Sequence, residues 1–140
     1  MSLLIGVTED LAACHALRRT VFIEEQGVSE AEEMDELDGE GIHVLARQDG
    51  IAVGTARLLV VPPMGKIGRL CVLASHRGTG VGRHLVETSL AILRDTQGVE
   101  TAALGAQAHA LNFYHRLGFE AEGPVYDDAG IPHRWMRRAL

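Results

Sequence analysis

The segment RLCVLASHRGTGVG, residues 69–82, holds the features that decide the fold of this chain. After Arg69, residues 70–73 are apolar and typical of a strand, and a turn with three glycines follows. Apolar side chains then repeat at helical spacing until Gly98. A strand, a glycine-rich turn and a helix in this order expose backbone N–H groups at the positive end of the helix. Such a turn suits a pyrophosphate, because glycine lets the backbone approach the ligand closely.

Three phosphate-binding patterns compete for this turn. The P-loop string GxxxxGK[ST] does not occur in the sequence. The dinucleotide string GxGxxG, started at Gly78, ends on Arg83, where close packing of helix on strand requires glycine or alanine. The third pattern, [RQ]xxGx[GA], is satisfied by Arg77, Gly80 and Gly82. A glycine-rich turn without function is the remaining alternative.

The hydrophobic pattern along the chain predicts the element order β-α-β-β-β-α-β-α-β-β. Thr8 is expected to cap the first helix, and Asp49-Gly50 is a strong hairpin signal. This order predicts one α/β (α+β) domain, residues 1–140, with a central mixed, mostly antiparallel sheet flanked by helices. The expected strands are about 3–7, 42–48, 51–61, 66–73, 99–104, 119–126 and 132–139, and the expected helices about 9–22, 81–98 and 108–117.

The formal net charge of −6 argues against a general nucleic-acid binder. The acidity is concentrated in residues 24–40, which hold nine acidic residues and no basic one. The remainder has 13 basic and 10 acidic residues, a balance of +3. We expect a mildly basic body with one acidic loop. Carboxylates without nearby histidine are usually a solvated face rather than a metal site, although such a face would attract cationic amines.

The sequence shows no feature of membrane insertion or secretion. No apolar run is long enough to cross a bilayer, and the first residues lack the basic flank of a signal peptide. We therefore expect a cytoplasmic protein. Cys14 and Cys71 lie in apolar surroundings without metal-ligand spacing, so we expect buried free thiols.

Two motifs resemble the GNAT superfamily of acetyltransferases. Residues 69–73 are similar to the LxV strand that precedes the coenzyme A loop, and residues 110–119, ALNFYHRLGF, resemble the FYxxxGF helix end. Further residues resemble the ElaA-like subgroup, so that the likeness covers nearly the whole chain. They are Arg18, Val21, Phe22, Glu25, Gln26, Glu33, Asp35, Asp38, His43 and the string Gly130 to His133.

The resemblance implies direct transfer of acetyl from acetyl-CoA to an amine in a ternary complex. It implies that the free backbone groups of Leu70, Cys71 and Val72 pair with pantetheine. It also implies that a backbone N–H near Cys71 or Val72 polarises the acetyl carbonyl, and one such donor contributes about 3 kcal/mol in other acyl transfers. The pyrophosphate is expected on the amides of Arg77, Gly78, Thr79, Gly80, Val81, Gly82 and Arg83. No metal is expected.

Tyr114 matches the family tyrosine that protonates the departing thiolate. A phenol has a pKa of about 10 and a thiol about 8.5, so the phenol is protonated at neutral pH. The alternative is that Phe113 and Tyr114 are core aromatics.

His133 is the first candidate for the base that takes a proton from the acceptor. Histidine titrates near neutrality, and His133 matches the histidine of the subgroup's G-x-P-H string. A structural histidine bound to a backbone carbonyl is the alternative. His43 is a second candidate, and Glu25 is a third, acting through water. Arg69 and Gln107 are expected near the acceptor, although Arg69 is equally expected to form an ion pair with the acidic loop.

The first functional hypothesis is an N-acetyltransferase acting on a small-molecule amine, with a homodimer as one possible assembly. The second is a protein acetyltransferase acting on lysine or an N-terminus. The third is a coenzyme A-binding module without turnover, which would need neither Tyr114 nor His133. An acylhomoserine-lactone synthase is a remoter alternative.

Overall fold

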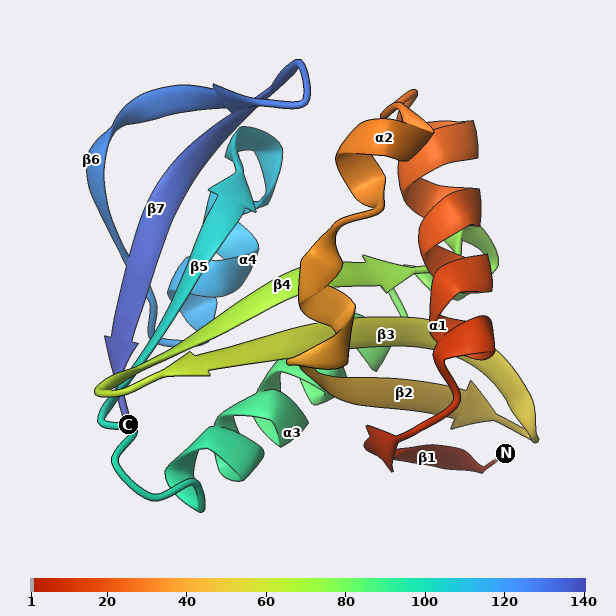
Figure 1. The fold of residues 1–140 in the computed structure, drawn as a ribbon, viewed down its shortest axis with the longest axis horizontal. Coiled ribbons are helices and arrows are strands. Elements are labelled where there is room, and N and C mark those ends of the chain that lie inside the picture. The colour runs from red at the N-terminus through yellow and green to blue at the C-terminus, as the bar shows by residue number, and fades with distance from the viewer. Residues whose placement is uncertain (1) are drawn as a thin grey trace.

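The computed structural model describes residues 2–140, which form one seven-stranded sheet with helices on both faces (Figure 1). The order of strands and long helices is the predicted one. The strands are β1 (Leu3–Thr8), β2 (Ile42–Gln48), β3 (Ile51–Val61), β4 (Met64–Val72), β5 (Thr101–Gln107), β6 (Glu120–Asp128) and β7 (Ile131–Ala139). The helices are α1 (Leu11–Arg18), α2 (Glu30–Glu33), α3 (Val81–Arg94) and α4 (Leu111–Arg116), and the shorter or irregular helical segments are η1 (Arg19–Glu25), η2 (Glu36–Gly39), η3 (Ala74–His76) and η4 (Ala108–Ala110).

The sheet has the strand order β1-β2-β3-β4-β5-β7-β6, and β4–β5 is its parallel pair. The prediction of a mixed, mostly antiparallel sheet is therefore confirmed. The β4–β5 pairing covers only the residue pairs from Met64–Thr101 to Lys66–Ala103. Beyond these pairs the two strands diverge (Figure 1), so the rest of β4 has one edge without a strand partner.

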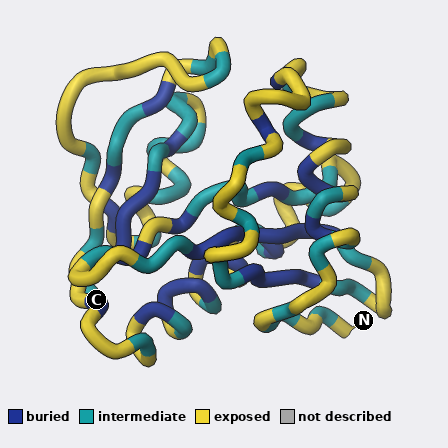
Figure 2. Tube along the Cα trace, in the orientation of Figure 1, coloured by how far each residue is buried: buried dark blue, intermediate teal, exposed yellow. Residues whose placement is uncertain are grey.

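The hydrophobic core lies between the sheet and α3, and the segments coloured as buried in Figure 2 are concentrated in the central strands and this helix. The predicted apolar rows of α3 are confirmed, with Leu85 and Leu93 fully buried. Two strand glycines allow the helix to approach closely. A Cβ on Gly54 would lie 2.8 Å from Leu85, and one on Gly65 would lie 2.4 Å from Leu93.

Three local predictions have different outcomes. The hairpin at Asp49-Gly50 is confirmed, with φ of 51° and 84° as this turn type requires. The prediction that Thr8 caps α1 is wrong, because Asp10 accepts the hydrogen bond from the Ala13 N–H. The first helix also does not end near Phe22, since η1 continues it to Glu25 in wider turns.

Three carboxylates of the acidic segment, Glu33, Asp35 and Asp38, do not form the solvated face that the composition predicts, whereas the other six are exposed. Glu33, with 3% of its side chain exposed, is ion-paired with Arg18, which is 1% exposed. Arg18 also donates to Asp38 at 2.8 Å, and Arg57 donates to both carboxylate oxygens of Asp35 at 2.7 and 3.0 Å. Buried arginines therefore hold α2 and η2 against the sheet.

This pairing changes the titration of Asp38. Burial raises its pKa, but hydrogen bonds from Arg18, His15 and Arg57 outweigh burial and hold the pKa well below its usual range. An aspartate with a lowered folded-state pKa stabilises the fold fully above its unfolded pKa of about 3.9. Its contribution is lost progressively as the pH falls from there towards the folded pKa. We expect the segment to loosen in acid.

The Arg18–Glu33 pair yields a stability prediction. Glu33→Gln leaves the buried charge of Arg18 without one of its partners. Breaking a buried ion pair in this way typically lowers the free energy of unfolding by about 3–5 kcal/mol. The matched control is Glu30→Gln, which removes an exposed ion pair with Arg19 from the same segment and should cost no more than about 1 kcal/mol. Urea unfolding at pH 7 measures both. Equal losses in the two variants would contradict the role given to the buried pair.

Candidate active site between β4 and β5

A cavity of about 570 Å³ opens where β4 and β5 diverge. This volume is typical of small-molecule and cofactor sites. One wall is formed by β4 and β5, and the others by η1 and α2 on one side and by the β6–β7 hairpin on the other. The cavity therefore collects side chains from most of the chain.

The β4 residues predicted to face pantetheine all line this cavity. They are Leu70, Cys71 and Val72. Burial raises the pKa of the Cys71 thiol to about 12, so this sulfur stays protonated at neutral pH and is a poor nucleophile. Cys71 and Cys14 are both buried free thiols, as expected. The chemistry offered by this part of β4 is that of its backbone.

The glycine-rich turn lies at one end of the cavity, with Arg77 and Gly82 in its lining. Gly78 and Gly80 have φ of 76° and 94°, a conformation that side-chain-bearing residues rarely adopt. Gly80 is the N-cap of α3, and no side chain caps this helix. The first N–H groups of α3 are therefore free to bind a ligand.

The other turn residues present backbone rather than side chains. The Thr79 hydroxyl donates to the His76 carbonyl at 2.6 Å. The Val81 side chain is buried in the core, and Arg83 is exposed near Glu87. The predicted pyrophosphate contacts of these residues accordingly depend on their amides.

An ion pair between Arg77 and Glu25 connects the glycine-rich turn to η1 on the other side of the cavity. The Arg77 guanidinium donates to both oxygens of Glu25, at 2.7 Å for the longer bond, and to the Val72 carbonyl at 3.0 Å. The hydrogen bonds from Arg77 hold the pKa of Glu25 below its usual range. Glu25 lines the cavity, but a lowered pKa makes it a weaker base than the sequence alone suggests.

Tyr114 lies in the cavity wall, within α4. Its ring makes edge contacts with Phe113 and Phe119, at centroid distances of 5.0 and 6.0 Å. Burial raises the pKa of its phenol, so the hydroxyl stays protonated at any physiological pH. Among residues 2–140, no group forms a hydrogen bond with this hydroxyl, which is therefore available as a donor.

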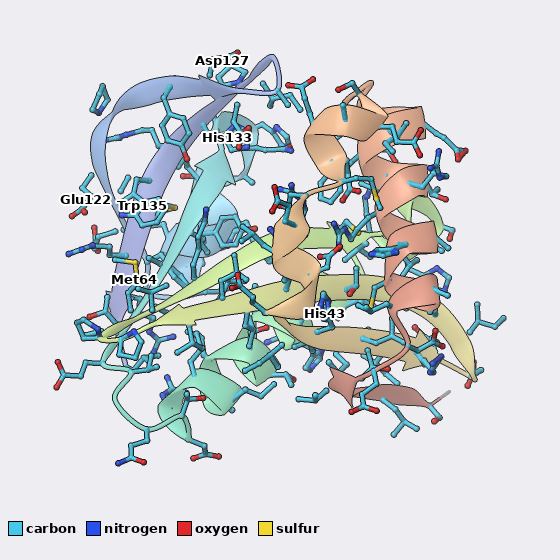
Figure 3. The ribbon with its side chains drawn as sticks, viewed as in Figure 1. His43, Met64, Glu122, Asp127, His133 and Trp135 are labelled. Carbon is cyan, nitrogen blue, oxygen red and sulfur yellow. The ribbon has the colours of Figure 1, made fainter. Side chains whose placement is uncertain are left out.

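His133 lines the cavity from the start of β7 (Figure 3). Its Nδ1 lies 2.7 Å from the Ile131 carbonyl oxygen. A carbonyl only accepts, so Nδ1 carries the proton and Nε2 of the neutral ring has the free lone pair. The carbonyl contact expected for a structural histidine thus also prepares this residue to accept a proton.

Tyr126 is a cavity residue that the sequence reasoning missed. It is the cross-strand neighbour of His133 on β6, and the two rings stack at 5.8 Å. Its hydroxyl lies over Gly105 of β5, where an added Cβ would be 2.3 Å away. Glycine inside a strand often marks such a close approach, so Gly105 was the available signal.

The two predicted acceptor contacts have different environments. Gln107 exchanges amide hydrogen bonds with Gln26, at 3.0 and 3.4 Å, and this pair links β5 to the end of η1. Arg69 forms ion pairs with Glu33 and Asp35 at 3.4 and 3.2 Å. Arg69 therefore forms the expected ion pair with the acidic loop. Both Arg69 and Gln107 line the cavity, and their contact with an acceptor stays a prediction.

His43 lies outside the cavity lining. It is on β2, in the other half of the sheet from His133 (Figure 3), and its Nε2 donates to the Asp38 carbonyl at 2.9 Å. The structure does not bring this second candidate base to the site. This hydrogen bond indicates that His43 stabilises the packing of η2 on the sheet.

Within residues 2–140, no group of three or more histidine, cysteine, aspartate or glutamate side chains is arranged to hold a metal ion. No helix in this range is long and apolar enough to span a membrane.

Comparison with known proteins identifies the fold and the family. Residues 9–140 match the family model described as an acetyltransferase (GNAT) domain. The chain is 35% identical to protein ElaA of Escherichia coli over 135 residues, 93% of this chain and 88% of that protein. The ElaA crystal structure superposes with a TM-score of 0.87 at 30% identity and covers 98% of this chain and 99% of its own.

Two further structures share the architecture. An acyl-CoA N-acyltransferase from Pseudomonas aeruginosa has a TM-score of 0.87 at 34% identity, covering 99% of this chain and 100% of that one. The PaiA N-acetyltransferase of Thermoplasma acidophilum, solved with coenzyme A, has a TM-score of 0.76 at 17% identity with full coverage of both chains. The chain belongs to the GNAT family of N-acetyltransferases and is similar to ElaA within it.

Proposed function

We propose that this protein transfers acetyl from acetyl-CoA directly to an amine, with a small molecule as the preferred acceptor. One observation carries the proposal: the unpaired edge of β4, the uncapped start of α3, Tyr114 and His133 surround one cavity. Coenzyme A in the Thermoplasma enzyme of the same fold supports the choice of donor.

The residues at the cavity fit two parts of coenzyme A, the diphosphate and pantetheine. The free N–H groups at the start of α3 suit a diphosphate, and Gly78 and Gly80 leave room for it to approach the backbone. The free β4 edge offers N–H and C=O groups to the amides of pantetheine, as an added strand would. When bound, acetyl-CoA supplies an activated thioester.

His133 and β4 act on the reacting groups. His133 Nε2 accepts the proton that the amine loses as its nitrogen attacks the acetyl carbon. A backbone N–H of the 70–72 stretch donates a hydrogen bond to the acetyl oxygen as negative charge develops there. The two proposed groups lie in the lining of the same cavity, which supports this assignment.

Tyr114 completes the transfer. Its protonated hydroxyl donates a proton to the departing sulfur, whose conjugate thiol has a pKa of about 8.5. The raised pKa of Tyr114 keeps its hydroxyl protonated before transfer. Because tyrosinate is a stronger base than the coenzyme A thiolate, Tyr114 regains a proton from water once the acyl–sulfur bond has broken.

The preference for a small acceptor is supported by the Gln26–Gln107 pair, which joins two walls of the cavity through amide hydrogen bonds. A protein acetyltransferase and a non-catalytic coenzyme A-binding module are the alternatives. Measuring thiol release from acetyl-CoA with small amines and with lysine peptides as acceptors distinguishes these three functions. A cytoplasmic location and a homodimer stay predictions.

Gly80→Val tests the proposed diphosphate site, which we call the diphosphate cradle, at Gly78, Gly80 and the start of α3. Valine at φ 94° forces the backbone out of its present path, so coenzyme A should bind at least about tenfold more weakly, or about 1.4 kcal/mol. Gly50→Val is the matched control, because Gly50 has a similar φ of 84° in a hairpin outside the cavity lining. Calorimetry measures both affinities. Wild-type affinity in Gly80→Val would refute the cradle.

The base is tested through pH dependence. In the wild-type protein kcat/KM should rise with pH as a cavity histidine loses its proton, and His133→Ala should abolish this rise and lower the rate by about 100-fold or more. His109→Ala removes another histidine from the cavity lining and should leave the profile unchanged. If kcat/KM still rises with pH in His133→Ala, another residue is the base.

The acid is tested with Tyr114→Phe. This change removes one oxygen and keeps the ring contacts with Phe113 and Phe119. We expect kcat to fall by about 100-fold or more, with the acetyl-CoA affinity nearly unchanged. Tyr126→Phe removes the other tyrosine hydroxyl from the cavity lining and is the control. Undiminished turnover in Tyr114→Phe would remove Tyr114 from the mechanism.

A further inference from the structure

Arg69 occupies an irregular position in β4. Its φ is 51°, a value that glycine adopts easily and arginine rarely does. Across the ladder, Thr55 faces Cys71 and Arg57 faces Gly68. One residue of β3 therefore stands opposite two residues of β4, and Arg69 is one of these two. This arrangement is a β-bulge.

The bulge sets the orientation of the catalytic part of β4. A shift of one residue in a strand turns each side chain and each N–H to the opposite side. Without the bulge, the amides of residues 70–72 that face the cavity would exchange places with those that face β3. The pairing with β5 ends at Lys66, so no strand on the other edge holds these residues in register.

The acidic segment holds the bulge in place through the Arg69 side chain. Its Nη2 donates to the Glu33 carbonyl at 3.1 Å and to Asp35 at 3.2 Å, and its Nε lies 3.4 Å from the Glu33 carboxylate. Glu33 and Asp35 are themselves ion-paired with Arg18 and Arg57. In Figure 1, the orange segment that follows α2 and contains η2 crosses in front of β3 and β4, consistent with these contacts.

We propose that Arg69 is a positioning residue, through which the acidic segment 24–40 fixes the β4 bulge and thereby aims the backbone N–H groups of residues 70–72 at the acetyl oxygen. This inference rests on the proposed acetyl transfer. It assigns a role to the acidic segment, and it replaces an acceptor contact as the main role of Arg69. Glycine would adopt the φ of this position more easily. Only arginine, however, can make all of the side-chain contacts with Glu33 and Asp35, which we call the anchor.

The anchor can be removed from either side. Arg69→Asn keeps a residue type that tolerates positive φ but shortens the side chain beyond reach of the acidic segment. Asp35→Asn weakens the anchor at a residue outside the cavity lining, where no contact with a bound acceptor is expected. Glu30→Gln is the matched control, because it neutralises an exposed carboxylate of the same segment that pairs with Arg19.

Turnover and hydrogen exchange are then measured. Arg69→Asn and Asp35→Asn should lower kcat by about 10- to 100-fold, as expected for a displaced catalytic group, with little change in the KM of the amine. Arg69→Lys keeps the charge and should recover part of the loss. In ligand-free protein, amides of residues 66–73 should exchange faster in the two anchor variants than in the wild type and Glu30→Gln.

Two results would overturn the proposal. A raised amine KM at unchanged kcat in Arg69→Asn would make Arg69 an acceptor contact. If Arg69→Asn and Asp35→Asn both keep the wild-type kcat and the wild-type amide exchange of residues 66–73, the bulge does not depend on the anchor. If the wild-type protein releases no thiol from acetyl-CoA with any amine, the proposed function fails instead, and the exchange of residues 66–73 still tests the anchor.

Discussion

The loss of pairing between β4 and β5 after Lys66 is the constraint on which the rest of the structure depends. Backbone N–H and C=O groups require partners, and a strand normally finds them in its neighbours. Here the divergence leaves one edge of β4 facing a cavity of about 570 Å³. A ligand that carries its own amides in an extended chain can satisfy this edge. The glycine-rich turn after β4 continues the same surface to the start of α3, whose free N–H groups suit a diphosphate.

A strand with a free edge needs support from elsewhere, and the charges of this chain supply it. Arg18, Arg57 and Arg69 bind the carboxylates of the acidic segment, and the buried Arg18–Glu33 pair is the centre of this network. Such a network contributes little net stability compared with apolar packing, but it fixes geometry, since removing one partner leaves a buried charge. It follows that Glu33, Asp35 and Asp38 serve the shape of the site, whereas the other six acidic residues of 24–40 are exposed.

Much of the fold could be predicted from the sequence because local signals agree with the tertiary structure. The Asp49-Gly50 hairpin and the apolar rows of α3 are examples. Thr8 misled because Asp10, two residues later, competes for the same N–H groups. The acidic segment was misjudged because composition does not reveal that three arginines from α1, β3 and β4 converge on it. In the site, motifs located the β4 residues and Tyr114 at the cavity, whereas Tyr126 escaped because its position depends on cross-strand register.

The central claim is that the free edge of β4 and the turn after it together receive the thioester carrier. Amide hydrogen exchange, resolved by residue and compared without and with saturating coenzyme A, tests this claim most directly. The account predicts slower exchange in two stretches, residues 70–72 and residues 77–83, with little change in β1, β2 and β6. Binding that protects another part of the chain while these two stretches exchange as before would contradict it.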